Sequence, residues 1–194
     1  MEGLWEQGGV LLVHVTMGIG LAACAGLRAF LPLFVVGLAG RFDWVPLSES
    51  FDWLAAWPAL VVFGVAVVAE VLADKFPVVD HVLDTVQTFV KPIAGALVMA
   101  TVVEEWAPLY LTVVAIVAGG ATAGVVHLTK AKLRLVSSVT TAGLGNPALS
   151  ASEDGVALAG VVGSIAVPPL VVVVLVVLIV LAWVAIRRLR PRSA

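Results

Sequence analysis

The chain has 194 residues, of which 61% are hydrophobic and 12% are charged, whereas soluble domains have roughly 45–50% and 25%. A soluble chain of this length cannot bury so much apolar surface, so the composition predicts a single integral-membrane domain over residues 1–194. The formal net charge of −2 gives no reason to expect a nucleic-acid partner, and the single cysteine excludes an internal disulfide and a cysteine-based zinc site.

Apolar runs predict an all-α polytopic bundle of about five to seven membrane segments, some of them short or re-entrant. The candidate segments in chain order are residues 9–27, 29–40, 58–73, 92–106, 109–126, 155–167 and 169–186. An amphipathic helix is expected at residues 77–91, after Pro77, and a basic cytoplasmic tail at residues 187–194.

Two of these segments, 29–40 and 155–167, are too short to cross a bilayer, because they reach only about 18–20 Å of a core of about 30 Å. Each adjoins a longer segment, and the divisions fall near Arg28 and at Pro168-Pro169. The order is long–short at the N-terminus and short–long at the C-terminus, which indicates an inverted repeat with discontinuous helices. Two kinked helices without symmetry are the alternative.

Charged residues inside apolar runs predict a polar pathway or substrate-binding site, since such groups are costly in a bilayer and usually functional. These residues are Arg28, Glu70, Asp74, Lys75, Asp80 and Asp84. The simplest partner for Glu70 is Arg28, and a pair that only ties two helices together is the alternative. Asp80 and Asp84 continue with Gln87 and Lys91 at steps of three and four, so the four share one face of a helix.

A basic face follows the segment 109–126. His127, Lys130 and Arg134 are spaced to share one side of a helix, and Asn146 follows in the same polar stretch. These four residues are candidates for binding an anion or a lipid head group; anchoring by positive charge on the cytoplasmic side is the alternative.

Residues 150–154 match a capping box before the apolar run that begins at 155, so Ser150, Glu153 and Asp154 are expected to cap that helix. Small residues four apart, such as Gly160 and Ser164, permit close helix packing in lipid and suit a compact bundle or a homo-oligomer.

The distribution of positive charge predicts the orientation of the chain in the membrane. The tail Arg187-Arg188-Leu189-Arg190 places the C-terminus in the cytoplasm, and a hairpin at 155–186 then puts residues 127–154 on the same side. The expected location is the cytoplasmic (inner) membrane, with multiple passes and with membrane lipids as partners.

No sequence motif indicates an enzyme. The chain has no His-Glu-x-x-His, no Gly-x-Ser-x-Gly and no P-loop, and His81 with its neighbouring aspartates fits no metal template. We therefore expect no catalytic residues, no metal and no cofactor.

Several segments together resemble a known family. They are Gly26-Leu27-Arg28-Ala29-Phe30, Glu70-Val71-Leu72-Ala73-Asp74-Lys75-Phe76-Pro77-Val78-Val79-Asp80, Pro92-Ile93-Ala94-Gly95, His127 with Lys130 and Arg134, Asn146-Pro147, and Ser150-x-x-Glu153-Asp154. Over about residues 15–170 the chain resembles a bacterial integral-membrane family catalogued as domain of unknown function 4126. The resemblance implies a one-domain membrane fold in which these charged residues form one constellation, and it implies no reaction.

The function expected from the charged residues is a small transporter or channel for an ion or small polar solute. A lipid-handling protein that binds or flips a phosphate head group is one alternative, and a non-catalytic membrane scaffold is another.

Overall fold

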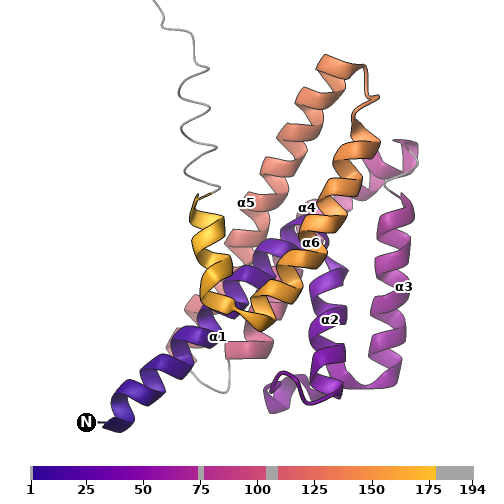
Figure 1. Cartoon of the computed structure of the whole chain (residues 1–194). Coiled ribbons are helices and arrows are strands. Elements are labelled where there is room, and N and C mark those ends of the chain that lie inside the picture. Colours follow the sequence, from indigo (N-terminus) through magenta and orange to yellow (C-terminus); the bar gives the residue numbers. More distant parts are fainter. Residues whose placement is uncertain (1, 74–76, 104–108, 178–194) are drawn as a thin grey trace, which may run out of the picture.

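The computed structural model describes residues 2–73, 77–103 and 109–177, and the elements formed by these residues are all helices (Figure 1). They are α1 (Glu2–Leu27), α2 (Phe30–Arg41), the short 3-10 helix η1 (Glu49–Ala55), α3 (Trp57–Ala73), α4 (Pro77–Val103), α5 (Leu109–Thr141), α6 (Asn146–Ala166) and a last helix, Pro168–Val177. The predicted all-α bundle is confirmed.

Successive helices run in opposite directions. α1 rises from the N-terminus, α2 descends beside it, α3 rises again, and α4, α5 and α6 continue the alternation (Figure 1). The end of α3, the start of α4 and the α5–α6 turn therefore lie at one end of the bundle, while η1 and its loop lie at the other (Figure 1). α1 is central, because it packs against α2, α4, α5 and α6.

Glycine permits a close contact between α4 and α5. A Cβ built on Gly119 of α5 would lie 2.6 Å from the carbonyl oxygen of Gly95 on α4, and one on Gly95 would lie 2.7 Å from the carbonyl oxygen of Gly119. Gly160 and Ser164 on α6 face Cys24 and Gly20 on α1 in the same way. Small residues thus let backbones approach, as expected in lipid.

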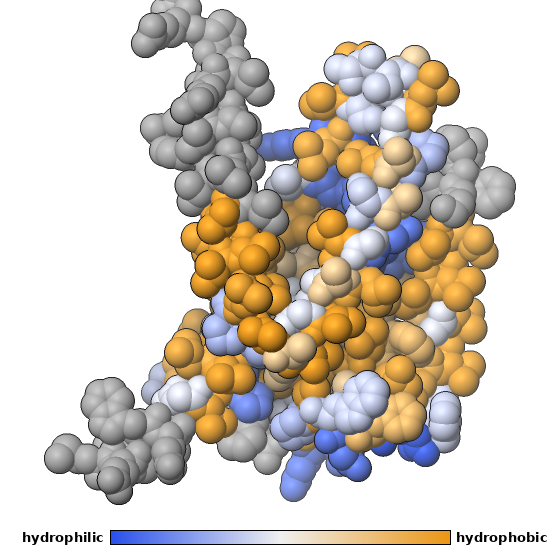
Figure 2. Space-filling model, viewed as in Figure 1, coloured by the Kyte–Doolittle hydropathy of each residue, from blue (hydrophilic) through white to orange (hydrophobic). Residues whose placement is uncertain are grey.

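Length and composition mark the chain as a membrane protein. Among the described residues, three helices are long and apolar enough to cross a membrane, within Gly8–Leu27, Thr85–Val103 and Leu109–Thr141. The bent pair η1–α3 counts as a fourth if it is one span. On the face shown in Figure 2, hydrophobic residues cover most of the middle, and strongly hydrophilic residues lie at the lower end and in the upper half. Trp44, with 72% of its surface exposed, and Trp57, with 59%, lie near η1, where an aromatic belt would meet the membrane surface.

The breaks expected near Arg28 and at Pro168-Pro169 are both present. α1 ends at Leu27 and α2 begins at Phe30; α6 ends at Ala166, and a new helix begins at Pro168. Proline has no N–H with which to continue a helix, which explains the second break. Residues 9–40 and 155–177 are therefore not continuous helices.

Three helices extend past the membrane segments expected from the sequence. Residues 127–141 continue α5, and residues 146–154 form the first turns of α6, so the polar stretch 127–154 is mostly helix. The amphipathic helix expected at 77–91 and the segment that begins at Pro92 are one helix, α4, with Pro92 inside it. Apolar runs mark only part of each helix, because the buried faces of these helices continue with polar side chains.

The fold predicts the membrane topology of its loops. Single cysteines at Leu144 (86% exposed), in the α5–α6 turn, and at Trp44, in the α2–η1 loop, should react from opposite sides of the membrane, because these loops lie at opposite ends of the bundle. The measurement is labelling of intact cells with a membrane-impermeant maleimide in a Cys24→Ala background. Labelling of both positions from one side contradicts the alternating arrangement.

The close crossing of α4 and α5 predicts a contrast between two glycines on one helix. Gly119→Ala should destabilise the protein by about 1–3 kcal/mol, because its methyl group overlaps the backbone of α4. Gly124→Ala is the control: its nearest neighbour is Pro92 at 3.6 Å, and the change should be neutral or slightly stabilising. Equal thermal stabilities of the two variants in detergent would show that the crossing is not this close.

Candidate functional site

The break between α1 and α2 is the centre of a buried polar site. Arg28 occupies the break, and its side chain is only 2% exposed. Around it lie Glu70 of α3, Gln87 of α4, Lys130 and Arg134 of α5, and Ser150 and Glu153 of α6, which are all buried. Four helices and the α1–α2 break therefore contribute to one polar site inside a largely apolar bundle.

Glu70 completes the start of α2. The first N–H groups of a helix have no partner within it, and Ala29, the residue before α2, provides no capping side chain. Instead, the N–H groups of Ala29 and Phe30 donate to Oε1 and Oε2 of Glu70, at 3.0 and 3.4 Å. Nε2 of Gln87 donates to the same Oε1 at 2.9 Å. A carboxylate at this position also complements the positive end of the helix dipole.

Lys130 completes the end of α1. Its Nζ donates to the carbonyl oxygen of Leu27, the last residue of α1, at 3.4 Å. A cation at this position complements the negative end of the α1 dipole. The same Nζ lies 3.1 Å from Oε2 of Glu153, which is also 3.6 Å from Nη2 of Arg134. One glutamate of α6 thus faces two cations of α5.

Arg28 ties the break to two other helices. Its Nε donates to Oδ1 of Asp154, with which it forms an ion pair, and its Nη2 donates to Oγ of Ser150 at 3.3 Å. Its Nη1 donates to the main-chain carbonyl of Glu70, also at 3.3 Å. The guanidinium therefore connects α6 and α3 to the break. Asp154 is the more accessible partner, with 29% of its side chain exposed.

A regular spacing places these groups on the inner faces of α5 and α6. The buried residues of α5 recur every three or four positions: Thr112, Ala115, Gly119, Ala123, His127, Lys130 and Arg134. Those of α6 do the same: Ser150, Glu153, Ala157, Val161 and Ser164. Each helix therefore has one buried face, which is apolar or small toward η1 and charged toward the α5–α6 turn.

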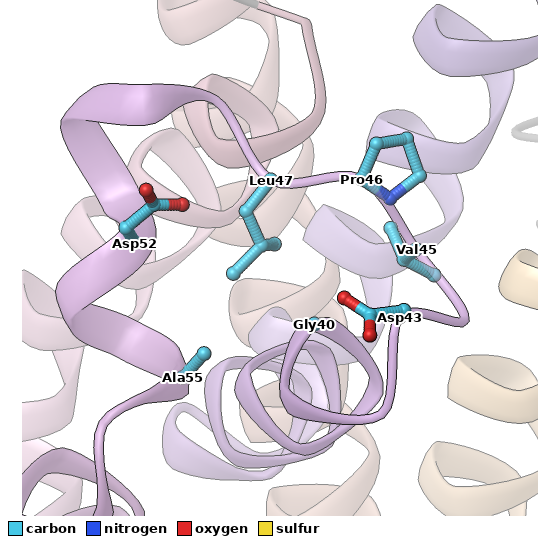
Figure 3. A pocket seen from close by; sticks show the side chains of 7 residues that line it. All are labelled: Gly40, Asp43, Val45, Pro46, Leu47, Asp52 and Ala55. Atoms are coloured by element: carbon cyan, nitrogen blue, oxygen red, sulfur yellow. The ribbon is translucent and has the colours of Figure 1, made fainter.

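A separate hollow of about 350 Å³ lies at the opposite end of the bundle (Figure 3). It is lined by Gly40, Asp43, Val45, Pro46, Leu47, Asp52 and Ala55. About 16 Å of helix separates Gly40 from the break, so these two aspartates do not belong to the buried site. Both are exposed to solvent.

The charged residues of the break and those of α6 belong to one sequence pattern. The family model described as Domain of unknown function (DUF4126) matches residues 15–188. The chain belongs to this family. No curated protein and no solved structure matches it. The DUF4126 match also extends past the motifs noted in the sequence, which reach about residue 170, so it includes the helix Pro168–Val177.

The DUF4126 fold brings together most of the residues singled out in the sequence, with different partners. Arg28 and Glu70 meet as expected, but the guanidinium contacts the main chain of Glu70 and pairs with Asp154. The Glu70 carboxylate instead holds the start of α2. A search for opposite charges could not find this arrangement, because the groups that donate to the Glu70 carboxylate are two backbone N–H groups and the amide of Gln87.

The expected capping by Ser150, Glu153 and Asp154 was wrong. α6 begins at Asn146, with Pro147 in its first turn, so these residues lie inside the helix. Their side chains contact Arg28, Lys130 and Arg134 instead. The capping motif was misleading because its spacing also places residues 150, 153 and 154 on one side of a continuous helix.

The other residues that the sequence analysis selected are not among the site contacts described above. Asn146 begins α6, where its Nδ2 donates to Oγ of Ser138, about two helical turns before Glu153. His127 is buried, and its Nε2 lies 3.3 Å from Oγ1 of Thr88 on α4. Asp74 and Lys75 lie outside the described residues, as do the side chains of Asp80 and Asp84 on α4.

Gln87 is a buried site residue that the sequence analysis did not select, and Lys91, one turn further along α4, is buried as well. Both lie on the polar stripe of α4, and Lys91 is fully buried. The signal was their spacing of four positions, which continues the stripe from Asp80 and Asp84. The stripe alone did not distinguish a face turned toward solvent from one turned toward the interior.

The ion pair between Arg28, in the break before α2, and Asp154 of α6 predicts that the effects of substituting these two residues on stability are coupled. Arg28→Met should destabilise the protein by about 3 kcal/mol, since it leaves a carboxylate and a hydroxyl without their cation. Asp154→Leu in the same chain should recover part of this loss. A double-mutant cycle on unfolding of the detergent-solubilised protein measures the coupling.

The exposed Arg41, which stacks over Trp57 at 4.7 Å, provides the control. Arg41→Met should cost no more than about 1 kcal/mol and should show no coupling to Asp154→Leu. A coupling near zero between positions 28 and 154 would mean that the two side chains do not meet.

Proposed function

We propose that this protein is a small transporter or channel that moves an ion or a small polar solute across the cytoplasmic membrane. The observation that carries the proposal is the presence of two ion pairs at a broken helix, the buried pair Lys130–Glu153 and the partly buried pair Arg28–Asp154. Ionisable groups within a membrane bundle usually mark a pathway. Discontinuous helices whose ends face polar groups recur at transporter binding sites.

The contacts of the site correspond to a closed state. Arg28, Glu70 and Lys130 are buried, and each bonds to other groups of the protein. A passing solute would have to replace some of these partners. A movement of α6 alone would separate its two carboxylates, Glu153 and Asp154, from Lys130 of α5 and from Arg28. Asp154, the most exposed member, would be the first group that the solute meets.

The two helix breaks support the same proposal. α1–α2 and α6 with Pro168–Val177 are each divided inside an apolar region, and discontinuous helices recur at transporter binding sites. The segment expected at 155–167 is the end of the 21-residue helix α6, so the short–long order expected of an inverted repeat is not present there. The basic tail after residue 186 places the C-terminus in the cytoplasm by the positive-inside rule. The α5–α6 turn would then be cytoplasmic as well.

The lipid head-group alternative has weaker support at this site. Lys130 and Arg134 face Glu153 inside the bundle rather than an open surface. A phosphate would have to enter against that carboxylate. The scaffold alternative predicts that the purified protein moves neither solute nor lipid.

Reconstitution into liposomes tests the proposal. We expect flux of at least one ion or small polar solute above that of protein-free liposomes. Asp154→Asn should change this flux several-fold while the protein stays folded, because it removes one charge of the site. Asp43→Asn, in the exposed hollow at the other end, is the matched control and should keep the wild-type rate.

Labelled-lipid flipping in the same liposomes separates the alternatives. Lipid movement without solute flux contradicts transport in favour of lipid handling. Neither activity, from protein that is monodisperse and helical, contradicts both. Equal flux in wild type, Asp154→Asn and Asp43→Asn would place the pathway away from the ion pairs.

A further inference from the structure

An apolar crevice passes beneath the helix Pro168–Val177. One hollow of about 410 Å³ lies on the α6 side of this helix, and another of about 320 Å³ lies on its α5 side. Both are lined by Ala23 of α1, Val126 of α5 and Leu175, so they meet under the helix. The helix stands beside α1 and α5 in Figure 1.

The lining has almost no polar group. Apart from the hydroxyl of Thr122 and the thiol of Cys24, each lining side chain is aliphatic or belongs to glycine. A cavity of this kind does not hold ordered water, which needs polar partners. Along α1 the crevice extends from Ile19 to Leu27, about 12 Å of helix.

The position of the crevice identifies the chemistry of its occupant. Its α1 wall belongs to the apolar span Gly8–Leu27, and its α5 wall to the span Leu109–Thr141. The solvent beside such spans is hydrocarbon, so an elongated apolar crevice there is suited to one aliphatic chain.

A positive charge lies beyond one end of the crevice. Lys132 is seven positions after Val125, a lining residue, so the two share a face of α5 about 10 Å apart along the helix. Lys132 is exposed. It lies toward the α5–α6 turn, where α5, about 50 Å long, extends beyond a hydrocarbon core of about 30 Å. An ammonium group there is placed to meet a lipid phosphate.

We propose that the crevice binds an anionic glycerophospholipid, with one acyl chain beneath the helix Pro168–Val177 and the phosphate beside Lys132. This site is separate from the ion pairs at the helix break, and it is independent of whether the protein transports a solute. The bound lipid would fill the space between the last described helix and the bundle.

Native mass spectrometry of the purified full-length chain tests the site. Phosphatidylglycerol and phosphatidylcholine with identical acyl chains are added separately at equal concentration. Wild type should retain phosphatidylglycerol more strongly. Ala121→Trp and Ala159→Trp, at exposed lining positions on the α5 and α6 sides, should each weaken retention of both lipids by about tenfold, because the indole occupies the chain's space.

Two further variants separate the chain from the head group. Lys132→Gln should lower retention of phosphatidylglycerol about fivefold, to the level of phosphatidylcholine, and leave phosphatidylcholine unchanged. Val114→Trp, at a position on α5 that is 62% exposed and outside the lining, is the control for nonspecific lipid and should retain lipid like wild type. Circular dichroism and gel filtration confirm that each variant is folded.

Three results would overturn the proposal: equal retention in wild type and both lining variants, equal loss in Val114→Trp, or no lipid retained by wild type. Photo-crosslinking from position 121 gives an independent readout. Crosslinks to residues 178–194 instead of lipid would assign the crevice to the chain's own C-terminal segment.

Discussion

The bundle depends on how the two ends of a broken helix are satisfied inside an apolar environment. Lipid has no groups that can bond the free N–H and C=O groups at such a break. Glu70 accepts the first N–H groups of α2, and Lys130 donates to the last carbonyl of α1. Each charge also interacts favourably with the helix dipole, because the carboxylate lies at the positive end of α2 and the ammonium group at the negative end of α1. The break therefore requires one acid from α3 and one base from α5.

These two charges determine where the other polar groups lie. Lys130 needs a counter-ion, which is Glu153, and Glu153 also faces Arg134. Arg28, carried into the interior by the break itself, pairs with Asp154 in the same turn of α6. α6 is thus held to α1 and α5 by charge near the α5–α6 turn and by small residues farther along, where Gly160 meets Cys24. A change at the charged end would alter how α6 sits on the bundle.

The ion-paired site and the apolar crevice are neighbours. Leu27 lines the crevice, and its carbonyl oxygen is the group that Lys130 holds. Val126 lines the crevice one turn before Lys130. A lipid chain beneath the helix Pro168–Val177 would therefore pack against the same turns of α1 and α5 that hold the break. Binding of a lipid in the crevice could therefore change the packing of the polar site, and a change in the polar site could change lipid binding, through these turns of α1 and α5.

The sequence by itself determined that the helices suit a membrane environment, that the fold is all-α, and where both helix breaks lie. These conclusions rest on the apolar composition, on the prolines at 168 and 169, and on an arginine inside an apolar run. Such features are visible in the sequence without knowledge of which segments pack together. It also identified Arg28, Glu70, Lys130 and Arg134 as charges that need an explanation. The spacing of polar residues indicated helical faces through Lys91 and through residues 127–134, but it did not show that these faces are buried.

Only the tertiary structure decided the partners. Glu70 bonds backbone groups of α2, which no pattern of side chains could indicate, and Arg28 pairs with a residue 126 positions away. Ser150, Glu153 and Asp154 look like the start of a helix because capping boxes and buried helix faces share the same short spacings. The difference lies in what packs against them, and that is a property of the assembled bundle rather than of any segment of the chain.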